Sequence, residues 1–128
     1  MKIEHIAIWT EDLEKMRSFY TTYFDLGSNE IYYNPDKQFS SYFLSFDNGA
    51  RIELMHKPDV KKRQGEDHPR HGLAHIAISV GSRESVDFLT EEIRKAGFKI
   101  VGEPRITGDG YYESVVSDPE DNLIEITE

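Results

Sequence analysis

The chain alternates between two kinds of hydrophobic pattern, and it does so in the same order in both halves. A strand-like stretch, HIAI, begins at His5, and the same four letters recur at residues 75–78. Each copy is followed by apolar residues with the spacing of one helix face, and then by stretches in which apolar and polar residues alternate. Each half is therefore predicted to form a strand, a helix and further strands.

The apolar faces of the two predicted helices correspond when the sequence is shifted by 70 residues. The matching pairs are Met16 with Val86, Phe19 with Leu89, Tyr23 with Ile93, and Leu26 with Ala96. Gly27 and Gly97 follow the last apolar position, where a helix commonly ends with a residue of positive φ. The internal similarity thus extends from the strand to the expected end of the helix.

The stretches after each glycine predict three strands per half. They are residues 31–33, 41–46 and 51–55 in the first half, and residues 99–103, 111–117 and 123–127 in the second. The last two strands of each half are joined by turn signals, Asn48-Gly49 and residues 118–121. Each half reads βαβββ, which predicts a single α+β domain made of module one (about 1–56), a polar linker (about 57–71) and module two (about 72–128).

Alternation along a strand decides which side chains share a face of the sheet. Ile6 and Ile8 are bulky and apolar, so they are expected to face the helix, whereas His5 faces the other side. The same argument places His75 away from the second helix. Glu53 and Glu125, on the closing strands, also alternate with apolar residues. Each half therefore offers one histidine and one glutamate on the face that its helix does not cover.

Two histidines and two glutamates form a suitable ligand set for one divalent cation. Imidazole nitrogen and carboxylate oxygen suit zinc, nickel, manganese or iron(II). Burying two glutamates without a counter-charge would cost several kcal/mol each, which favours a metal site formed by His5, Glu53, His75 and Glu125. The alternative is an internal ion-pair network in which Arg51 and protonated histidines neutralise the carboxylates.

Composition excludes several other classes of protein. The 128 residues contain no cysteine, so disulfides, thiolate metal sites and cysteine nucleophiles are excluded. A formal net charge of −9 argues against nucleic acid and anionic lipid as partners. No apolar run approaches the roughly 20 residues that span a bilayer, and there is no glycine-rich phosphate loop or serine elbow. We expect a soluble, cytoplasmic protein with a small-molecule substrate.

These motifs resemble the vicinal oxygen chelate superfamily, which contains glyoxalase I, methylmalonyl-CoA epimerase, extradiol dioxygenases, fosfomycin resistance thiol transferases and bleomycin-binding proteins. The resemblance lies in EHIAIWTEDLEKMRSFY with His5, GARIELM with Glu53, GLAHIAISV with His75 and DPEDNLIEI with Glu125. It implies two βαβββ modules that form a curved, barrel-like mixed sheet around a cleft. It also implies one divalent metal ion in each site.

The His-Glu-His-Glu set resembles that of glyoxalase I and implies a metal-dependent lyase or isomerase. Such an enzyme acts on a small carbonyl or hemithioacetal substrate through a metal-stabilised enediolate. Glu125 is the expected catalytic base, with Glu53 as the equivalent candidate. The alternatives are a metal-dependent thiol transferase of the fosfomycin-resistance type and a non-catalytic small-molecule binding protein. The position after HIAI holds Trp9, whereas glutathione-dependent glyoxalases have an arginine there.

Four further residues are expected to bind the substrate: Trp9, Arg51, Tyr42 and Phe46. A two-residue turn at Asn48-Gly49 pairs Leu44 with Glu53, which places Tyr42 and Phe46 on the cleft face. Arg51 is expected either to hold a substrate anion or to pair with a carboxylate.

Other side chains are expected to play smaller parts. Tyr111 and Tyr112 should face opposite ways, so at most one of them reaches the site. His56, His68 and His71 are expected to be solvated loop residues, although a linker that folds over the cleft would bring His71 to it. The resemblance implies a homodimer, with each site formed within one chain or shared between two.

Overall fold

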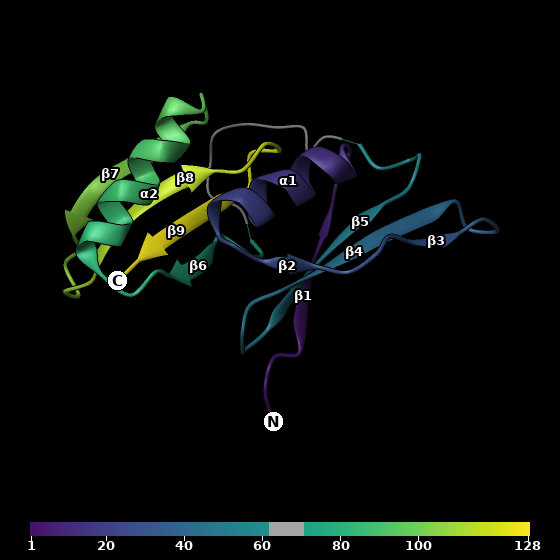
Figure 1. The fold of residues 1–128 in the computed structure, drawn as a ribbon, viewed down its shortest axis with the longest axis horizontal. Coiled ribbons are helices and arrows are strands. Elements are labelled where there is room, and N and C mark those ends of the chain that lie inside the picture. Colours follow the sequence, from purple (N-terminus) through teal and green to yellow (C-terminus); the bar gives the residue numbers. More distant parts are fainter. Residues whose placement is uncertain (62–70) are drawn as a thin grey trace. The chain divides into compact units, whose positions relative to one another are not determined.

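The chain is built from two compact units, Met1–Gln64 and Gly65–Glu128 (Figure 1). The computed structural model describes residues 1–61 and 71–128. The predicted linker, about 57–71, therefore falls in large part outside the described residues, as does His68.

The first unit forms a mixed sheet with one helix. Its elements are β1 (His5–Trp9), α1 (Leu13–Tyr23), β2 (Gly27–Ser28), β3 (Tyr32–Asn34), β4 (Phe39–Ser45) and β5 (Arg51–His56). The strand order is β1-β5-β4-β2, with β3 also pairing with β4. The β1–β5 pair is parallel and the others are antiparallel. The single strand predicted at residues 31–33 is replaced by β2 and β3, which both pair with β4.

The second unit repeats this plan more simply. Its elements are β6 (Ile76–Ser79), α2 (Arg83–Lys95), β7 (Ile100–Ile106), β8 (Tyr112–Ser117) and β9 (Leu123–Thr127). The strands are ordered β6-β9-β8-β7, and β6 pairs with β9 in parallel. The predicted α+β class and the βαβββ repeat are confirmed, and each unit has its own open, curved sheet (Figure 1).

Each helix begins at a capping residue and covers one face of its sheet. The side chains of Asp12 and Ser82 accept hydrogen bonds from the backbone N–H groups of Lys15 and Ser85, at 2.9 and 3.1 Å. The helices bury the apolar residues that alternate with the candidate ligands. The buried set includes Met16, Phe19, Leu44, Ile52 and Leu54 in unit one, and Val86, Ile93, Val116, Ile124 and Ile126 in unit two. Neither helix in the described residues is long and apolar enough to cross a bilayer.

The second helix ends as the sequence predicts, whereas the first does not. Gly97 has a φ of 87°, as predicted, but Gly27 has no positive φ and belongs to β2. The left-handed residue after α1 is Asp25, with φ 53°. Asp25 and Gly97 are 72 positions apart, and α2 has 13 residues against 11 in α1. The offset between the two modules is thus 70 residues at the start of the helix and 72 after it, because α2 is two residues longer than α1.

The closing hairpins both have five-residue loops, and this corrects the predicted register. Phe43, and not Leu44, pairs with Glu53, just as Val115 pairs with Glu125. A two-residue type I′ turn needs positive φ at both central residues. Only Gly49 has it (φ 96°), and Asp121 has it at the matching position of the second hairpin (φ 67°). The register predicted from Asn48-Gly49 is therefore wrong by one residue.

Asp118 fixes the second of these loops. Its buried carboxylate accepts hydrogen bonds from the backbone N–H groups of Glu120 and Asn122, both at 2.9 Å, and from the Asn122 amide at 2.8 Å. These bonds hold the loop that sets the pairing of β8 with β9. Asp118 therefore helps to determine on which face Glu125 lies.

Replacing Asp118 with alanine is expected to lower the free energy of unfolding by about 2–3 kcal/mol. The substitution removes a charged acceptor and leaves buried donors unpaired. Urea denaturation followed by circular dichroism measures the loss. The exposed turn residue Asp36 is the matched control, and its alanine variant should lie within about 0.5 kcal/mol of the parent protein. An equal loss in both variants would contradict the role assigned to Asp118.

Candidate metal and substrate site

In the first unit, His5 and Glu53 lie beside each other on the face of the sheet opposite α1. His5 is the first residue of β1, and Glu53 is opposite Ala7 in the parallel β1–β5 pair. The Nε2 atom of His5 is 3.8 Å from Oε2 of Glu53. The side chain of Glu53 is 15% exposed and that of His5 is 38% exposed. An imidazole nitrogen and a carboxylate oxygen are thus both reachable from solvent.

The second unit brings His75 and Glu125 together in the same way. His75 immediately precedes β6, and Glu125 is opposite Ala77. The Nε2 atom of His75 is 3.1 Å from Oε2 of Glu125. Each unit therefore places one predicted histidine next to its predicted glutamate on the face that its helix leaves uncovered.

In the part of the chain that the structure describes, no arginine or lysine pairs with Glu53 or Glu125. Among the described residues, the histidine of the same unit is the only ion-pair partner of Glu53 and of Glu125. The predicted alternative was an ion-pair network of Arg51 and protonated histidines. Its histidine contacts are present in both units, whereas Arg51 pairs with Glu4 and not with Glu53 or Glu125 in this part of the chain. In residues 1–61 and 71–128, no group of three or more histidine, cysteine, aspartate or glutamate side chains lies close enough to hold a metal. The described arrangement is thus one two-residue donor pair per unit.

Glu4 connects His5 to Arg51. Its carboxylate accepts hydrogen bonds from Nδ1 of His5 and from the Arg51 guanidinium, with an Nε to Oε1 distance of 2.9 Å. The hydrogen bond from His5, followed by that from Arg51, lowers the pKa of Glu4 below its usual value. With Nδ1 of His5 engaged as a donor, Nε2 is the nitrogen left to face Glu53. In the second unit Ala74 precedes His75, so no equivalent carboxylate comes from that position.

Tyr42 lies on the helix side of the sheet, contrary to its predicted position. It is opposite Leu54 in the β4–β5 ladder, and its hydroxyl donates to Oε1 of Glu14 on α1 at 2.6 Å. This hydrogen bond raises the pKa of Tyr42. Phe46 lies one residue beyond the end of β4, where the ladder no longer places it beside Glu53. Both corrections follow from the five-residue loop, because a shift of one residue moves every side chain to the other face.

Phe43 lies beside Glu53 on the face opposite α1, where the predicted register had placed Tyr42 and Phe46. Its ring meets the His5 ring edge-on, with centroids 5.4 Å apart, and the Arg51 guanidinium lies 4.1 Å above its centroid. Phe43 was not predicted because the Asn48-Gly49 pair indicated a two-residue loop. A loop with an odd number of residues would have placed Phe43 opposite Glu53. The second hairpin, with the same spacing from Val115 to Glu125, contained the signal for such a loop.

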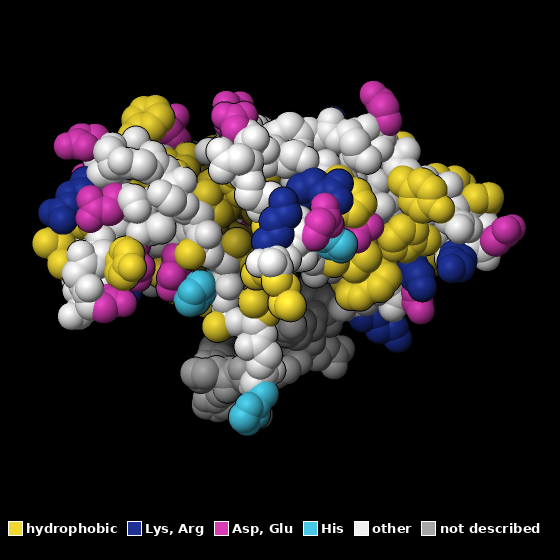
Figure 2. All heavy atoms as spheres, turned by 90° about the horizontal axis from the view of Figure 1, so that it is seen from below, with side chains coloured by type: hydrophobic (Ala, Val, Ile, Leu, Met, Phe, Trp, Pro, Cys, Tyr) yellow, Lys and Arg dark blue, Asp and Glu magenta, His cyan; other side chains and the backbone are white. Residues whose placement is uncertain are grey.

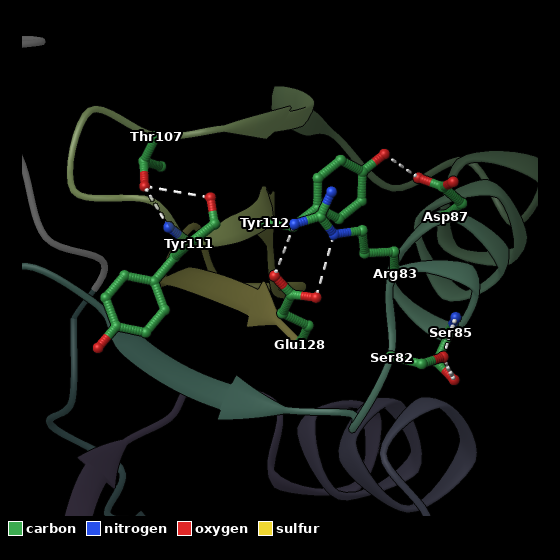
Figure 3. A network of polar contacts seen from close by, with 8 residues as sticks. All are labelled: Ser82, Arg83, Ser85, Asp87, Thr107, Tyr111, Tyr112 and Glu128. Carbon is green, nitrogen blue, oxygen red and sulfur yellow. Dashed lines mark hydrogen bonds and ion pairs between the residues drawn. The ribbon is translucent and has the colours of Figure 1, made fainter.

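Tyr112 points to its own helix, and Tyr111 points away from it (Figure 3). The Tyr112 hydroxyl donates to Asp87 on α2 at 2.7 Å, and Arg83 lies 5.1 Å from its ring centroid while pairing with Glu128. Tyr111 is 58% exposed. The prediction that the two tyrosines face opposite ways is confirmed.

Arg105 is a cation that the sequence did not single out. The β7–β8 ladder changes register between Gly102 and Arg105, which sets Arg105 opposite Glu113, with Nη2 at 3.4 Å from Oε1. A side chain at position 102 would meet Nη1 of Arg105 at 3.1 Å and Val115 at 3.4 Å, so glycine leaves the space that Arg105 uses. This bulge places the Arg105 guanidinium beside Gly102, whose ladder partner, Val115, is also the partner of Glu125.

Comparison with known proteins assigns the family. Residues 2–126 match the family described as the Glyoxalase/Bleomycin resistance protein/Dioxygenase superfamily. The chain belongs to this superfamily. The predicted resemblance to the vicinal oxygen chelate proteins is confirmed.

The glyoxalase superfamily relatives include proteins with and without an assigned activity. The chain is 31% identical over 97 residues to the uncharacterized protein YwkD of Bacillus subtilis (strain 168), a match that covers 76% of this chain and 73% of YwkD. Glyoxalase I from Zea mays is similar in structure, with a TM-score of 0.80 and 24% identity over 98% of this chain. The chain spans only 44% of that maize protein. The trypanothione-dependent glyoxalase I of Leishmania major has a TM-score of 0.80 and 23% identity, with coverage of 100% of this chain and 86% of its own. At these identities, the structural likenesses are evidence for the fold.

Proposed function

We propose that this glyoxalase superfamily member is a divalent-metal-dependent lyase or isomerase of glyoxalase type that acts on a small carbonyl or hemithioacetal substrate. The observation that carries the proposal is the repeated donor pair, His5 with Glu53 and His75 with Glu125, on the helix-free face of each sheet. Glyoxalase I proteins among the structural relatives support the reaction class.

The residues fit a divalent metal by their chemistry. Each pair consists of one imidazole nitrogen and one carboxylate oxygen, the donors that zinc, nickel, manganese and iron(II) accept. Each carboxylate is mostly buried and has only its histidine as an ion-pair partner within the described residues, so a bound cation would supply the missing positive charge. His5, Glu53, His75 and Glu125 together would hold the ion, whose bound form supplies a Lewis acid that polarises a substrate oxygen.

The proton transfer is assigned to a glutamate of the chain. Glu125 is the proposed base: its carboxylate removes the proton from the carbon next to the polarised oxygen and returns it to the neighbouring carbon. Glu125 is 22% exposed and its oxygen is 3.1 Å from His75, so it is both accessible and held in place. Glu53, at 15% exposure, is the equivalent group of the first unit.

A proton NMR assay in deuterated water tests this reaction class. Purified protein, either metal-loaded or treated with chelator, would be incubated with 2-oxoaldehydes, with and without a small thiol. A lyase or isomerase of this type converts the aldehyde to a 2-hydroxy acid, or to its thioester when the thiol is present, and only in the metal-loaded sample. Any deuterium in the new C–H bond measures how far the proton held by the glutamate exchanges with solvent before it is returned. A thiol transferase would consume the thiol without forming a 2-hydroxy product, and a binding protein would leave all substrates unchanged. Either of these two outcomes would contradict the proposal.

Glu4 is expected to strengthen metal binding through His5. A carboxylate that accepts the second ring N–H of a ligating histidine orients the ring and makes it a better donor. Glu4→Gln should therefore weaken binding of zinc or nickel about tenfold, measured by isothermal titration calorimetry. Glu30→Gln changes an exposed carboxylate elsewhere in the first unit and should leave the affinity unchanged. Equal affinities for Glu4→Gln and the parent protein would refute this role.

We also propose a homodimer. The superfamily arrangement pairs two modules for each site, and these modules belong either to one chain or to two. Mixing His5→Ala with His75→Ala protein decides between them. Metal binding and turnover reappear in the mixture only if one intact donor pair from each chain can meet in a mixed dimer.

A further inference from the structure

We propose that the helix-free face of the first unit's sheet binds a small organic anion that carries an aromatic ring. In this arrangement the ring packs against Trp9 and Phe39, and Lys57 compensates the negative charge. This inference rests on the proposed function and deepens it, because it names a substrate class for the face that carries His5 and Glu53.

Three aromatic side chains form a cluster on this unit. The Trp9 and Phe39 rings meet edge-on, with centroids 6.2 Å apart and planes at 87°, and the Tyr32 ring is 6.2 Å from that of Phe39. Trp9 and Tyr32 remain 49% and 53% exposed. Figure 2 shows hydrophobic side chains gathered over the end of the molecule where β3 and β4 lie, with basic side chains beside them. An exposed aromatic cluster of this kind can accept another ring with the same edge-on geometry.

The cluster shares its face with the first donor pair. Trp9 and His5 are four residues apart on β1, so they point the same way, and the burial pattern of β1 alternates accordingly. Phe39 and Phe43 are likewise four residues apart on β4, and Phe43 contacts His5. A ligand whose ring lies on Trp9 and Phe39 can therefore extend along the strands toward Glu53.

Lys57 gives this end of the face its charge preference. Its Nζ atom lies 5.6 Å from the centroid of the Trp9 ring. Within the part of the chain that the structure describes, Lys57 has no acidic partner, whereas Arg51 on the same unit is paired with Glu4. In a chain with a net charge of −9, a cation over an exposed indole that has no acidic partner among the described residues favours an anionic aromatic ligand over a neutral one.

The second unit provides an internal comparison. Its donor pair has the same residue types as the first, but Ser79 stands where the first unit has Trp9, 70 positions earlier. Phe39 corresponds to Tyr111, 72 positions later, which is 58% exposed. The second unit thus keeps an aromatic residue at the position of Phe39 but has a serine at the position of Trp9, so the Trp9–Phe39 pair is not required to build the sheet or to place the histidine and glutamate. A ring pair that the sheet does not need points to recognition of a ligand.

The test uses Trp9 itself as the probe, because it is the only tryptophan of the chain. Full-length protein, metal-free and metal-loaded, would be titrated with phenylacetate, acetate and phenylacetamide while tryptophan fluorescence is followed, with calorimetry as a second readout. Phenylacetate should bind with a Kd at least tenfold lower than those of the other two. Lys57→Gln and Phe39→Leu should each raise that Kd about tenfold, whereas Lys37→Gln, in the exposed turn before β4, should not change it.

Three results would overturn this inference. The first is equal affinity for phenylacetate and phenylacetamide. The second is an equal change in the Kd for phenylacetate in Lys57→Gln and Lys37→Gln. The third is that Phe39→Leu converts a dimer to a monomer without changing the affinity for phenylacetate. The last result would assign the cluster to contact with a second copy of the chain. The metal content of the same samples would be measured to separate this test from that of the proposed function. Selective phenylacetate binding by a protein that takes up no metal would refute the metal-dependent reaction but would support the aromatic anion site.

Discussion

Glu125→Gln is expected to lower turnover about a thousandfold while the protein remains folded. A glutamine cannot accept the substrate proton, and general base catalysis contributes 10²–10⁴-fold in typical enzymes. The substitution keeps the size of a side chain that is 22% exposed, so the free energy of unfolding should change little. Initial rates on the best 2-oxoaldehyde substrate, at saturating metal, measure the effect.

The matched control is Glu84→Gln, in the exposed first turn of α2, which should retain full turnover. Glu53→Gln locates the base. A thousandfold loss in Glu53→Gln with near-normal turnover in Glu125→Gln would transfer the catalytic role to the first unit. If Glu53→Gln instead retained metal and turnover while Glu125→Gln lost both, a three-ligand transferase would be favoured.

Two neighbouring residues of β5 are expected to have opposite importance for stability. Leu54 is fully buried against α1, whereas Glu53 lies on the other face with His5 as its ion-pair partner. In metal-free protein, Leu54→Ala should lower the free energy of unfolding by about 3–5 kcal/mol, because it removes apolar contacts and leaves a cavity. Glu53→Ala should not lower it, because the substitution removes a mostly buried carboxylate whose counter-charge the metal-free protein lacks.

Urea denaturation in the presence of chelator measures both variants, since bound metal would stabilise the native state and obscure the comparison. Ile106→Ala, at a position that is 61% exposed, is the control for loss of an aliphatic side chain without loss of core packing. A large loss in Glu53→Ala together with a small one in Leu54→Ala would mean that the faces of β5 are reversed.

The faces of the donor strands could be predicted from the sequence because both faces are strongly patterned. Ile6 and Ile8 in β1, and Ile52 and Leu54 in β5, left only one face for His5 and Glu53. The repeated HIAI motif and the shift near 70 residues then gave the second pair. This prediction used only alternation, which depends on local geometry and not on loop conformation.

The register of the β4–β5 hairpin could not be predicted because it depends on backbone angles in the loop. Asn48-Gly49 is a strong signal for a two-residue turn, yet Asn48 does not adopt the positive φ that such a turn requires. The loop therefore has five residues, which moves Tyr42 to the helix and Phe43 to His5. The predicted end of α1 was wrong for a similar reason, because Asp25 adopts the left-handed conformation that Gly27 was expected to adopt.

The contacts of Arg51 and Arg105 could not be predicted from the sequence for another reason. Arg51 lies over Phe43 and pairs with Glu4, a contact between side chains 47 positions apart. Arg105 depends on a change of ladder register next to Gly102. Neither feature leaves a periodic trace in the sequence, because each depends on how separate strands are paired.

The most direct test of this account is the metal content of four proteins: the parent, His5→Ala, His75→Ala and His56→Ala. Each protein would be loaded with zinc and separated from excess zinc by gel filtration. The bound zinc would then be measured by mass spectrometry of the metal. His56 is the control, since its Nδ1 contacts the Thr10 carbonyl oxygen at 2.8 Å on the first unit. We predict one tightly bound ion per chain in the parent and in His56→Ala, and its loss in both other variants. A full equivalent of zinc in either His5→Ala or His75→Ala would contradict a single site that needs one donor pair from each unit.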